Sequence, residues 1–155
     1  MGFGFDLHPL VAGRPLVLGG VTVPSDVGLD GHSDADVLSH AIAEALLGAL
    51  ALGDLGRHFP DTDPRWRGVS SLVLLKGALA MIVARGARLI NVDATVLAQA
   101  PRLAPRLPEM AKRLADTLGI ALDAVSVKAK SPEGLGLVGR REGIAAMAVV
   151  SLEVA

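Results

Sequence analysis

The sequence predicts an α/β (α+β) fold, a sheet of four or five strands with helices mainly on one face. Segments with strand periodicity alternate with segments of helical periodicity along the chain. The last segment, residues 143–154, is apolar on both faces, so a strand there needs either helices on both faces or a second subunit against it. The length of 155 residues fits one domain, residues 1–155.

The first elements are short strands. Phe3 to His8 predicts a strand that ends at Pro9, because proline has no N–H for a ladder. Residues 15–23 predict a hairpin, since Gly19-Gly20 separates two apolar runs. Residues 24–31 are expected to form a loop.

A helix and a long loop are expected next. Ser33 and Asp36 fit the capping pattern Ser-x-x-Asp before an apolar run, which predicts a helix from Ser33 to about Leu52. Residues 53–68 contain three glycines and two prolines without a regular period, so they predict a loop. A loop of this length in a compact domain favours a functional role.

The remaining segments alternate between helix and strand. Glycines at 86 and 119 mark helix ends, and β-branched residues mark the strands. The expected elements are a helix over 69–84, a strand over 88–98, a helix over 105–118, and strands over 125–130 and 143–154.

Composition excludes several classes of protein. A net charge of −1 and 3% aromatic residues argue against nucleic-acid binding. The longest apolar stretch, residues 69–90, is interrupted by charged side chains, which argues against a membrane span. With no cysteine, disulfides and thiolate metal sites are excluded, and the cytoplasm is the default location. A hydrophobic content of 51% predicts that the domain buries surface in an oligomer.

Asp6, His8 and His40 are the most informative polar residues. Asp6 and His8 are two apart on a strand, so their side chains point to one face, and His40 stands on the following helix. One carboxylate and two imidazoles with an open position make a divalent-cation site of the kind catalytic zinc uses. A turn residue and a surface histidine are the alternative. Asp36 either supports the His40 imidazole or only caps the helix.

Other polar residues lie in loops at element ends. His32 and Ser33 precede a helix N-terminus, where free N–H groups attract phosphate, although Ser33 alone would serve as a cap. The loop after strand 125–130 carries Glu133, a hard oxygen ligand suited to Mg²⁺ or Mn²⁺ on a diphosphate. Arg140 is either part of an anion clamp or a solvated turn.

Several spaced motifs occur in a recognisable order. They are Gly4-Phe-Asp-Leu-His8, His32-Ser-Asp-Ala-Asp-Val-Leu-Ser-His40, Asp54-Leu-Gly56, Phe59-Pro-Asp-Thr-Asp63-Pro, Ala98-Gln-Ala-Pro101, Glu133-Gly-Leu-Gly and Gly139-Arg140. Through these motifs nearly the whole chain resembles the 2-C-methyl-D-erythritol 2,4-cyclodiphosphate synthases, enzymes of the non-mevalonate isoprenoid pathway.

The resemblance implies two metals and a substrate site. Asp6, His8 and His40 would hold one zinc ion per chain, Glu133 would bind Mg²⁺ or Mn²⁺ at the substrate diphosphate, and His32 and Ser33 would touch substrate phosphate. The methylerythritol part would be surrounded by Asp54, Leu55, Gly56, Phe59, Pro60, Asp61, Thr62 and Asp63. The cytidine and its phosphates would be held by Ala98, Gln99, Ala100, Pro101, Arg102, Leu103, Ala104, Lys130, Ser131, Pro132 and Glu133.

The chain departs from the family pattern at three places. The family commonly has Thr-Thr before the glutamate, so here the hydroxyl contact to phosphate falls to Ser131. Arg102 stands where a lysine is common, which keeps the charge but changes its geometry. Leu137-Val138 replaces an aromatic residue before Arg140, near the axis of the homotrimer that the resemblance implies.

The implied reaction is an intramolecular phosphoryl transfer. The substrate, 4-diphosphocytidyl-2-C-methyl-D-erythritol 2-phosphate, closes to the 2,4-cyclodiphosphate and releases CMP, in sites between neighbouring subunits. Two alternatives use the same residues. One is a non-catalytic trimeric module that binds an isoprenoid diphosphate, and the other is a metal-dependent phosphoesterase that delivers water.

Overall fold

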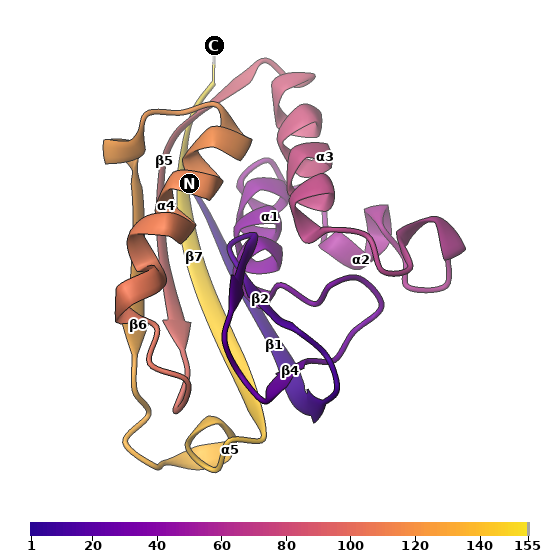
Figure 1. Ribbon diagram of the computed structural model, residues 1–155. Helices are drawn as coiled ribbons and strands as arrows, with labels where there is room; N and C mark the ends of the chain where they lie inside the picture. The colour runs from indigo at the N-terminus through magenta and orange to yellow at the C-terminus, as the bar shows by residue number, and fades with distance from the viewer. Residues whose placement is uncertain (155) are drawn as a thin grey trace.

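A five-stranded sheet forms the frame of the computed structural model, which describes residues 1–154 (Figure 1). Its strand order is β4-β1-β7-β5-β6. The strands are β1 (Gly2–Ala12), β4 (Val27–Leu29), β5 (Ala87–Leu97), β6 (Val125–Lys130) and β7 (Gly143–Val154). A separate hairpin pairs β2 (Leu16–Leu18) with β3 (Val21–Val23). The α/β class and the hairpin at Gly19-Gly20 are as the sequence predicts.

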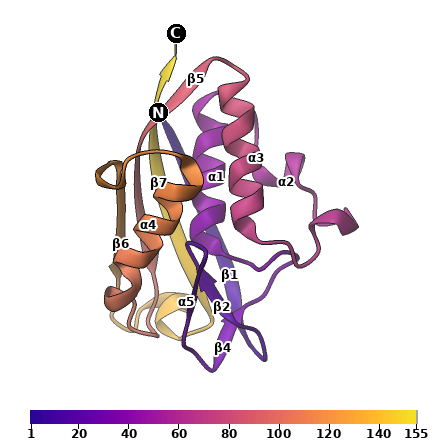
Figure 2. The same cartoon turned by 45° about the horizontal axis from the view of Figure 1, so that its top comes forward.

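The helices lie on one side of this sheet, as Figures 1 and 2 show from two directions. Only β5 and β6 run parallel, and they are joined through α4, as parallel neighbours require a crossover. Helix α1 packs on β1 and β7, α4 packs on β6, and α3 packs on α1. The helices are α1 (Val37–Ala49), α2 (Leu55–His58), α3 (Ser71–Val83), α4 (Leu107–Leu118) and α5 (Gly136–Gly139), with 3₁₀ turns at Pro64–Trp66, Ala104–Arg106 and Leu122–Ala124.

Two glycines let β1 lie directly against α1. A β-carbon on Gly2 would stand 1.9 Å from the carbonyl oxygen of Ala45, and one on Gly4 would stand 2.0 Å from that of Ala41. Both glycines are buried and face the helix, because they are two residues apart on the strand. Asp6 follows in the same register, so its side chain also points toward α1.

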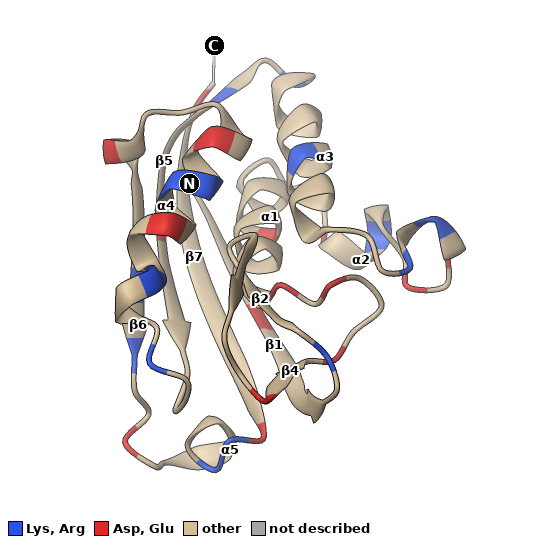
Figure 3. Ribbon diagram, viewed as in Figure 1, with Lys and Arg blue, Asp and Glu red and all other residues tan. Residues whose placement is uncertain are grey.

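The opposite side of the sheet has exposed apolar side chains. We call Phe3, Phe5, Leu7, Met147 and Val149 the open face; Phe3 is 62% exposed and Phe5 52%. Phe3 pairs with Val149 and Phe5 with Met147, so these side chains form one continuous surface. Charged residues are absent from β7 until Glu153, as Figure 3 shows. A contiguous apolar surface of this kind marks an interaction site.

Four boundary predictions are wrong. Strand β1 continues through Pro9, which is tolerated because Pro9 stands at the last pair with β7, opposite Gly143. Residues 27–29 of the expected loop form β4 on the edge beside β1. Helix α1 begins at Val37, with Asp36 as the N-cap rather than Ser33. The expected loop 53–68 contains α2 and a 3₁₀ turn.

Strands β6 and β7 have the predicted bounds. Helix α4 ends as expected at Gly119, which adopts a left-handed conformation with φ of 67°. None of the helices within the described residues has the length and apolar character needed to cross a bilayer.

Candidate metal centre and functional site

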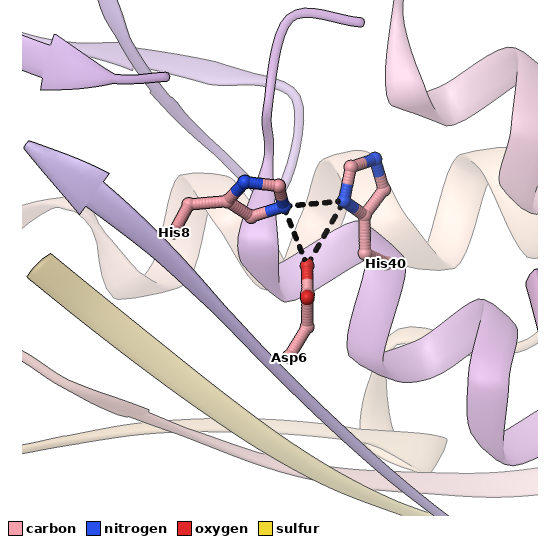
Figure 4. Close-up of side chains that lie close together, drawn as sticks. All are labelled: Asp6, His8 and His40. Carbon is pink, nitrogen blue, oxygen red and sulfur yellow. Dashed lines mark hydrogen bonds and ion pairs between the residues drawn. The ribbon is translucent and has the colours of Figure 1, made fainter. Parts of the chain in front are cut away.

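Asp6, His8 and His40 converge on one point between β1 and α1 (Figure 4). Oδ2 of Asp6 lies 2.9 Å from Nε2 of His8 and 3.0 Å from Nδ1 of His40. The two ring nitrogens are 3.2 Å apart. His40 on α1 reaches Asp6 and His8 because Gly2 and Gly4 allow α1 to lie directly against β1. The structure therefore brings together the three side chains that the sequence analysis singles out.

The electrostatics of this cluster reflect mutual attraction. Burial raises the pKa of Asp6, but hydrogen bonds and charge from His40 and His8 outweigh it, so the pKa falls well below its usual range. For His8, burial lowers the pKa, but the hydrogen bond and the charge of Asp6 together outweigh burial, so the pKa is raised. The Asp6 carboxylate is therefore held in its ionised form beside the two histidines.

The donor set fits a divalent cation. One carboxylate oxygen and two imidazole nitrogens lie within 4.8 Å of one another. Nδ1 of His8 donates to the carbonyl oxygen of Asp30 at 2.8 Å, so Nε2 of neutral His8 presents its lone pair to the cluster. Metal-binding histidines commonly have such an outer hydrogen bond. Two nitrogens and one oxygen are the ligand count of a catalytic zinc site with an open position.

A cavity of about 470 Å³ opens over the cluster. Its walls come from β1, the segment before α1, α1 itself, and the α2 region. The lining residues are Asp6, His8, Gly31, His32, Ser33, His40, Glu44, Leu55, Gly56, Phe59, Pro60, Asp61 and Leu74. A larger groove of about 750 Å³ between α3 and α4 contains none of the predicted site residues, so the smaller cavity is the candidate site.

Phe59 holds one wall of the cavity in place. Its ring occupies a notch on α3 at Gly77, where a β-carbon would stand 2.7 Å from Cζ of the ring. Trp66 packs edge-on against the same ring, with centroids 5.2 Å apart. The loop after α2 is therefore anchored to α3 by aromatic packing.

Three of the residues expected around the methylerythritol part do not line the cavity. Asp54 caps α2 by accepting a hydrogen bond from the backbone N–H of Arg57, and Asp63 forms an ion pair with Arg65. Thr62 is exposed. The carbonyl oxygen of Asp63 lies 3.1 Å from Nε2 of His32, so this residue contacts the site through its backbone.

Asp36 does not support the His40 imidazole. It is fully buried, and its two oxygens accept hydrogen bonds from the N–H groups of Gly19, Gly20 and Ser39 and from the Ser39 hydroxyl. Burial raises its pKa despite these bonds. Asp36 is therefore the N-cap of α1, and its carboxylate already accepts the N–H of Ser39 in the first turn of that helix.

Most of the other predicted residues form a second cluster beyond the ends of β5 and β6. A cavity of about 250 Å³ is lined by Ala98, Gln99, Pro101, Arg102, Leu103, Ala104, Ala129, Lys130 and Ser131. Ala100 and Pro101 line another cavity of about 380 Å³ with Arg141. Pro132, Glu133, Leu137 and Arg140 line neither of them.

Glu133 lies in the loop that follows β6. Its backbone N–H donates to Oγ of Ser131 at 3.1 Å, and the next N–H, of Gly134, donates to Gln99. In Figure 1, this loop and α5 lie below the strands at the lower end of the sheet, away from α2. Within one chain, Glu133 does not line the cavity that contains Asp6, His8 and His40.

Glu44 is a cavity residue that the sequence analysis missed. It lies one turn after His40 on the same face of α1, a spacing that could have indicated it. Its Oε1 accepts a hydrogen bond from the N–H of Leu55 at 3.2 Å. Burial raises the pKa of Glu44, and the nearby charges of Asp54 and Asp6 raise it further.

Known proteins resemble the chain over nearly its whole length. It is 60% identical over 153 residues to a 2-C-methyl-D-erythritol 2,4-cyclodiphosphate synthase of Laribacter hongkongensis, covering 99% of this chain and 94% of that one. It is 58% identical over 152 residues to the synthase of the same name from Bordetella avium, covering 98% and 94%. A solved 2C-methyl-D-erythritol-2,4-cyclodiphosphate synthase in a CDP-bound form superposes with a TM-score of 0.91 at 41% identity, covering 98% of this chain and 99% of that one. The profile of the YgbB family matches residues 1–153, and the chain belongs to this family.

Proposed function

We propose that this protein is a 2-C-methyl-D-erythritol 2,4-cyclodiphosphate synthase, a phosphorus–oxygen lyase of non-mevalonate isoprenoid biosynthesis. The relatives named above carry this activity in their names. The single observation that supports it most is the cluster of Asp6, His8 and His40 at the base of a cavity. The substrate and product are water-soluble phosphates, and the proposed location is the cytoplasm.

The reaction needs no side-chain nucleophile. An oxygen of the substrate's 2-phosphate attacks the phosphorus of the diphosphate that is bonded to the methylerythritol. A P–O bond forms there, the P–O bond to CMP breaks, and CMP leaves with the electron pair. Because both reacting groups belong to one molecule, holding them together can supply roughly 7–11 kcal/mol of the barrier.

Asp6, His8 and His40 are proposed to hold zinc, and Glu133 to hold Mg²⁺ or Mn²⁺. These cations supply neutralisation of the phosphate charge when they are bound. His32 and Ser33 lie beside the cluster and are proposed to bind the 2-phosphate. The negative charge of the substrate phosphates would be balanced by these cations and by the hydrogen-bond donors beside them.

The apolar wall of the cavity is proposed to receive the methylerythritol part. Leu55, Phe59, Pro60 and Leu74 line the cavity opposite the polar cluster. Such a wall excludes water, which is the competing nucleophile in this reaction. Because water is excluded, the bound substrate would cyclise, whereas a phosphoesterase with the same metal ligands would hydrolyse it.

The second cluster is proposed to hold the cytidine and its phosphates. One of the solved relatives is a CDP-bound form. Since Glu133 does not line the cavity of His40 in one chain, a site that uses both draws them from neighbouring subunits. The open face of β1 and β7 offers an apolar surface for such assembly, and we propose a homotrimer.

A product assay tests the proposal. The purified chain is given the cytidine diphosphate substrate with zinc and Mg²⁺, and phosphorus NMR follows the products. We expect CMP and the 2,4-cyclodiphosphate in equal amounts, the latter as two coupled signals without a free monoester. CMP with an open-chain bisphosphate would establish a phosphoesterase instead, and binding without release would establish a binding module.

A further inference from the structure

The outward nitrogen of His40 enters a buried hydrogen-bond chain. Nε2 lies 2.8 Å from Oγ of Ser71 and 3.2 Å from Oγ of Ser33. The Ser71 hydroxyl in turn donates a short hydrogen bond to Oδ1 of Asp34. Ser71 has no exposed surface and stands at the first turn of α3. The chain therefore runs from the helix that holds His40 to a different helix, away from the cavity.

The protons in this chain can be assigned from the acceptors. An ionised carboxylate only accepts, so the single proton of the Ser71 hydroxyl points to Asp34. Ser71 Oγ then has no proton for His40 and must accept one from Nε2. Ser33 Oγ accepts the N–H of Ala35 at 3.1 Å and lies 3.2 Å from Ser71 Oγ.

This assignment fixes the tautomer of neutral His40. With the proton on Nε2, the lone pair of Nδ1 points at Asp6, 3.0 Å away. His8 has the complementary arrangement, because its Nδ1–H is bound to Asp30 and its Nε2 lone pair points at the same place. Two lone pairs and a carboxylate oxygen then converge, which is an arrangement that a bound cation stabilises.

We propose that Ser71 and Asp34 are positioning residues that fix the ring orientation and tautomer of His40 as a metal ligand. Neither residue lines the cavity, so neither touches substrate there. The backbone keeps Ser71 in place, because its N–H also donates to Asp34 and the N–H of Asp34 donates to Val69. The proposal rests on the metal centre of the proposed function.

Replacing Ser71 with alanine removes the acceptor of the Nε2 proton. Loss of an outer hydrogen-bond partner typically weakens metal binding by roughly 10–100-fold, and we expect Ser71→Ala to do so. The matched control is Ser39→Ala. Ser39 is equally buried and its hydroxyl donates to Asp36 at 2.7 Å, but it makes no hydrogen bond with the His40 ring. Ser39→Ala should lose stability without losing zinc affinity.

Zinc affinity of each full-length variant is measured by competition with a chromophoric chelator. Asp34→Asn should weaken zinc binding in the same direction, because an amide can donate as well as accept and no longer fixes the serine proton. The double variant should bind zinc as Ser71→Ala does, since the chain is already broken. Additive losses of zinc affinity in the double variant would show that Asp34 acts independently of Ser71. This result would overturn the proposed hydrogen-bond chain from Asp34 through Ser71 to His40.

Nitrogen NMR of the metal-free wild-type protein gives a readout that does not depend on any variant. At a pH where the imidazole is neutral, we expect the His40 proton on Nε2, and a mixture of tautomers in Ser71→Ala. A proton on Nδ1 in the wild type would overturn the proposal. If wild-type protein binds no zinc, the metal centre of the proposed function fails; if it binds zinc and Ser71→Ala binds it equally well, this inference alone fails.

Discussion

Replacing Gly4 with alanine should separate α1 from β1 and pull His40 away from Asp6. The new β-carbon would lie 2.0 Å from the Ala41 carbonyl oxygen and 2.6 Å from the Ala45 nitrogen. Real contacts of this kind begin near 3.0 Å, so helix and strand have to move apart by about 1 Å. Both obstructing atoms belong to the backbone of a helix, so no side chain can rotate out of the way.

The cost follows from this overlap. Overpacking a core typically costs roughly 1–3 kcal/mol, and a clash with a helix backbone belongs at the upper end, about 3 kcal/mol. A shift of that size also takes Nδ1 of His40, now 3.0 Å from Asp6, beyond hydrogen-bond distance. The variant should therefore lose both free energy of unfolding and zinc affinity.

Urea denaturation at a fixed protein concentration measures the first loss, and zinc content per folded chain measures the second. The matched control is Gly48→Ala on the same helix. A β-carbon there would be 3.6 Å from the nearest atom, the carbonyl oxygen of Phe3. Helix propensity then predicts a gain of about 1 kcal/mol. If Gly4→Ala is as stable as the wild type and retains its zinc, close approach of α1 is not what builds the site.

Four other variants or measurements test separate parts of the argument. His40→Ala should lose about one zinc per chain while staying folded, which elemental analysis and circular dichroism check; unchanged zinc content would place the metal elsewhere. Glu133→Gln should keep zinc and assembly but slow turnover strongly, and activity within a few-fold of the wild type, measured as CMP release, would move the second metal to another residue. Asp36→Asn should cost about 1–3 kcal/mol in urea denaturation, because one amide group would face N–H and O–H donors; equal stability would mean that these bonds contribute nothing. Light scattering should give a mass near three chains, and a monomer would remove the basis for shared sites.

Local patterns were sufficient to predict most elements. Strands β6 and β7 were predicted with correct bounds because continuous apolar or alternating runs are flanked by glycine or proline. Strand β4 was missed because three residues with a central glycine show no periodicity. The start of α1 was misplaced because Ser33 and Asp36 are both good caps, and only the long-range bonds to Gly19 and Gly20 decide between them.

The residues of the candidate site were likewise predicted where the pattern is local in the sequence, and missed where the contact joins distant segments. The two-residue spacing of Asp6 and His8 predicted a shared face, and the structure brings His40 to that face. The contact of Ser71 with His40 joins residues 31 apart in the chain, and no local pattern indicates it. Glu133 remains a prediction, because a single chain does not bring it to the cavity of His40.

At Gly77, where α3 receives the Phe59 ring, a substitution that stabilises the helix would reduce the space for substrate. Glycine inside a helix is unfavourable by about 1 kcal/mol relative to alanine, so helix propensity alone recommends Gly77→Ala. The added methyl group would push the Phe59 ring out of its notch, toward the cavity it lines. A Gly77→Ala substitution made to stabilise α3 against heat would then narrow the candidate site, although Gly77 does not line that cavity. The same displacement of Phe59 would weaken the binding of an inhibitor that fills the cavity, even though Gly77 is not in contact with that inhibitor.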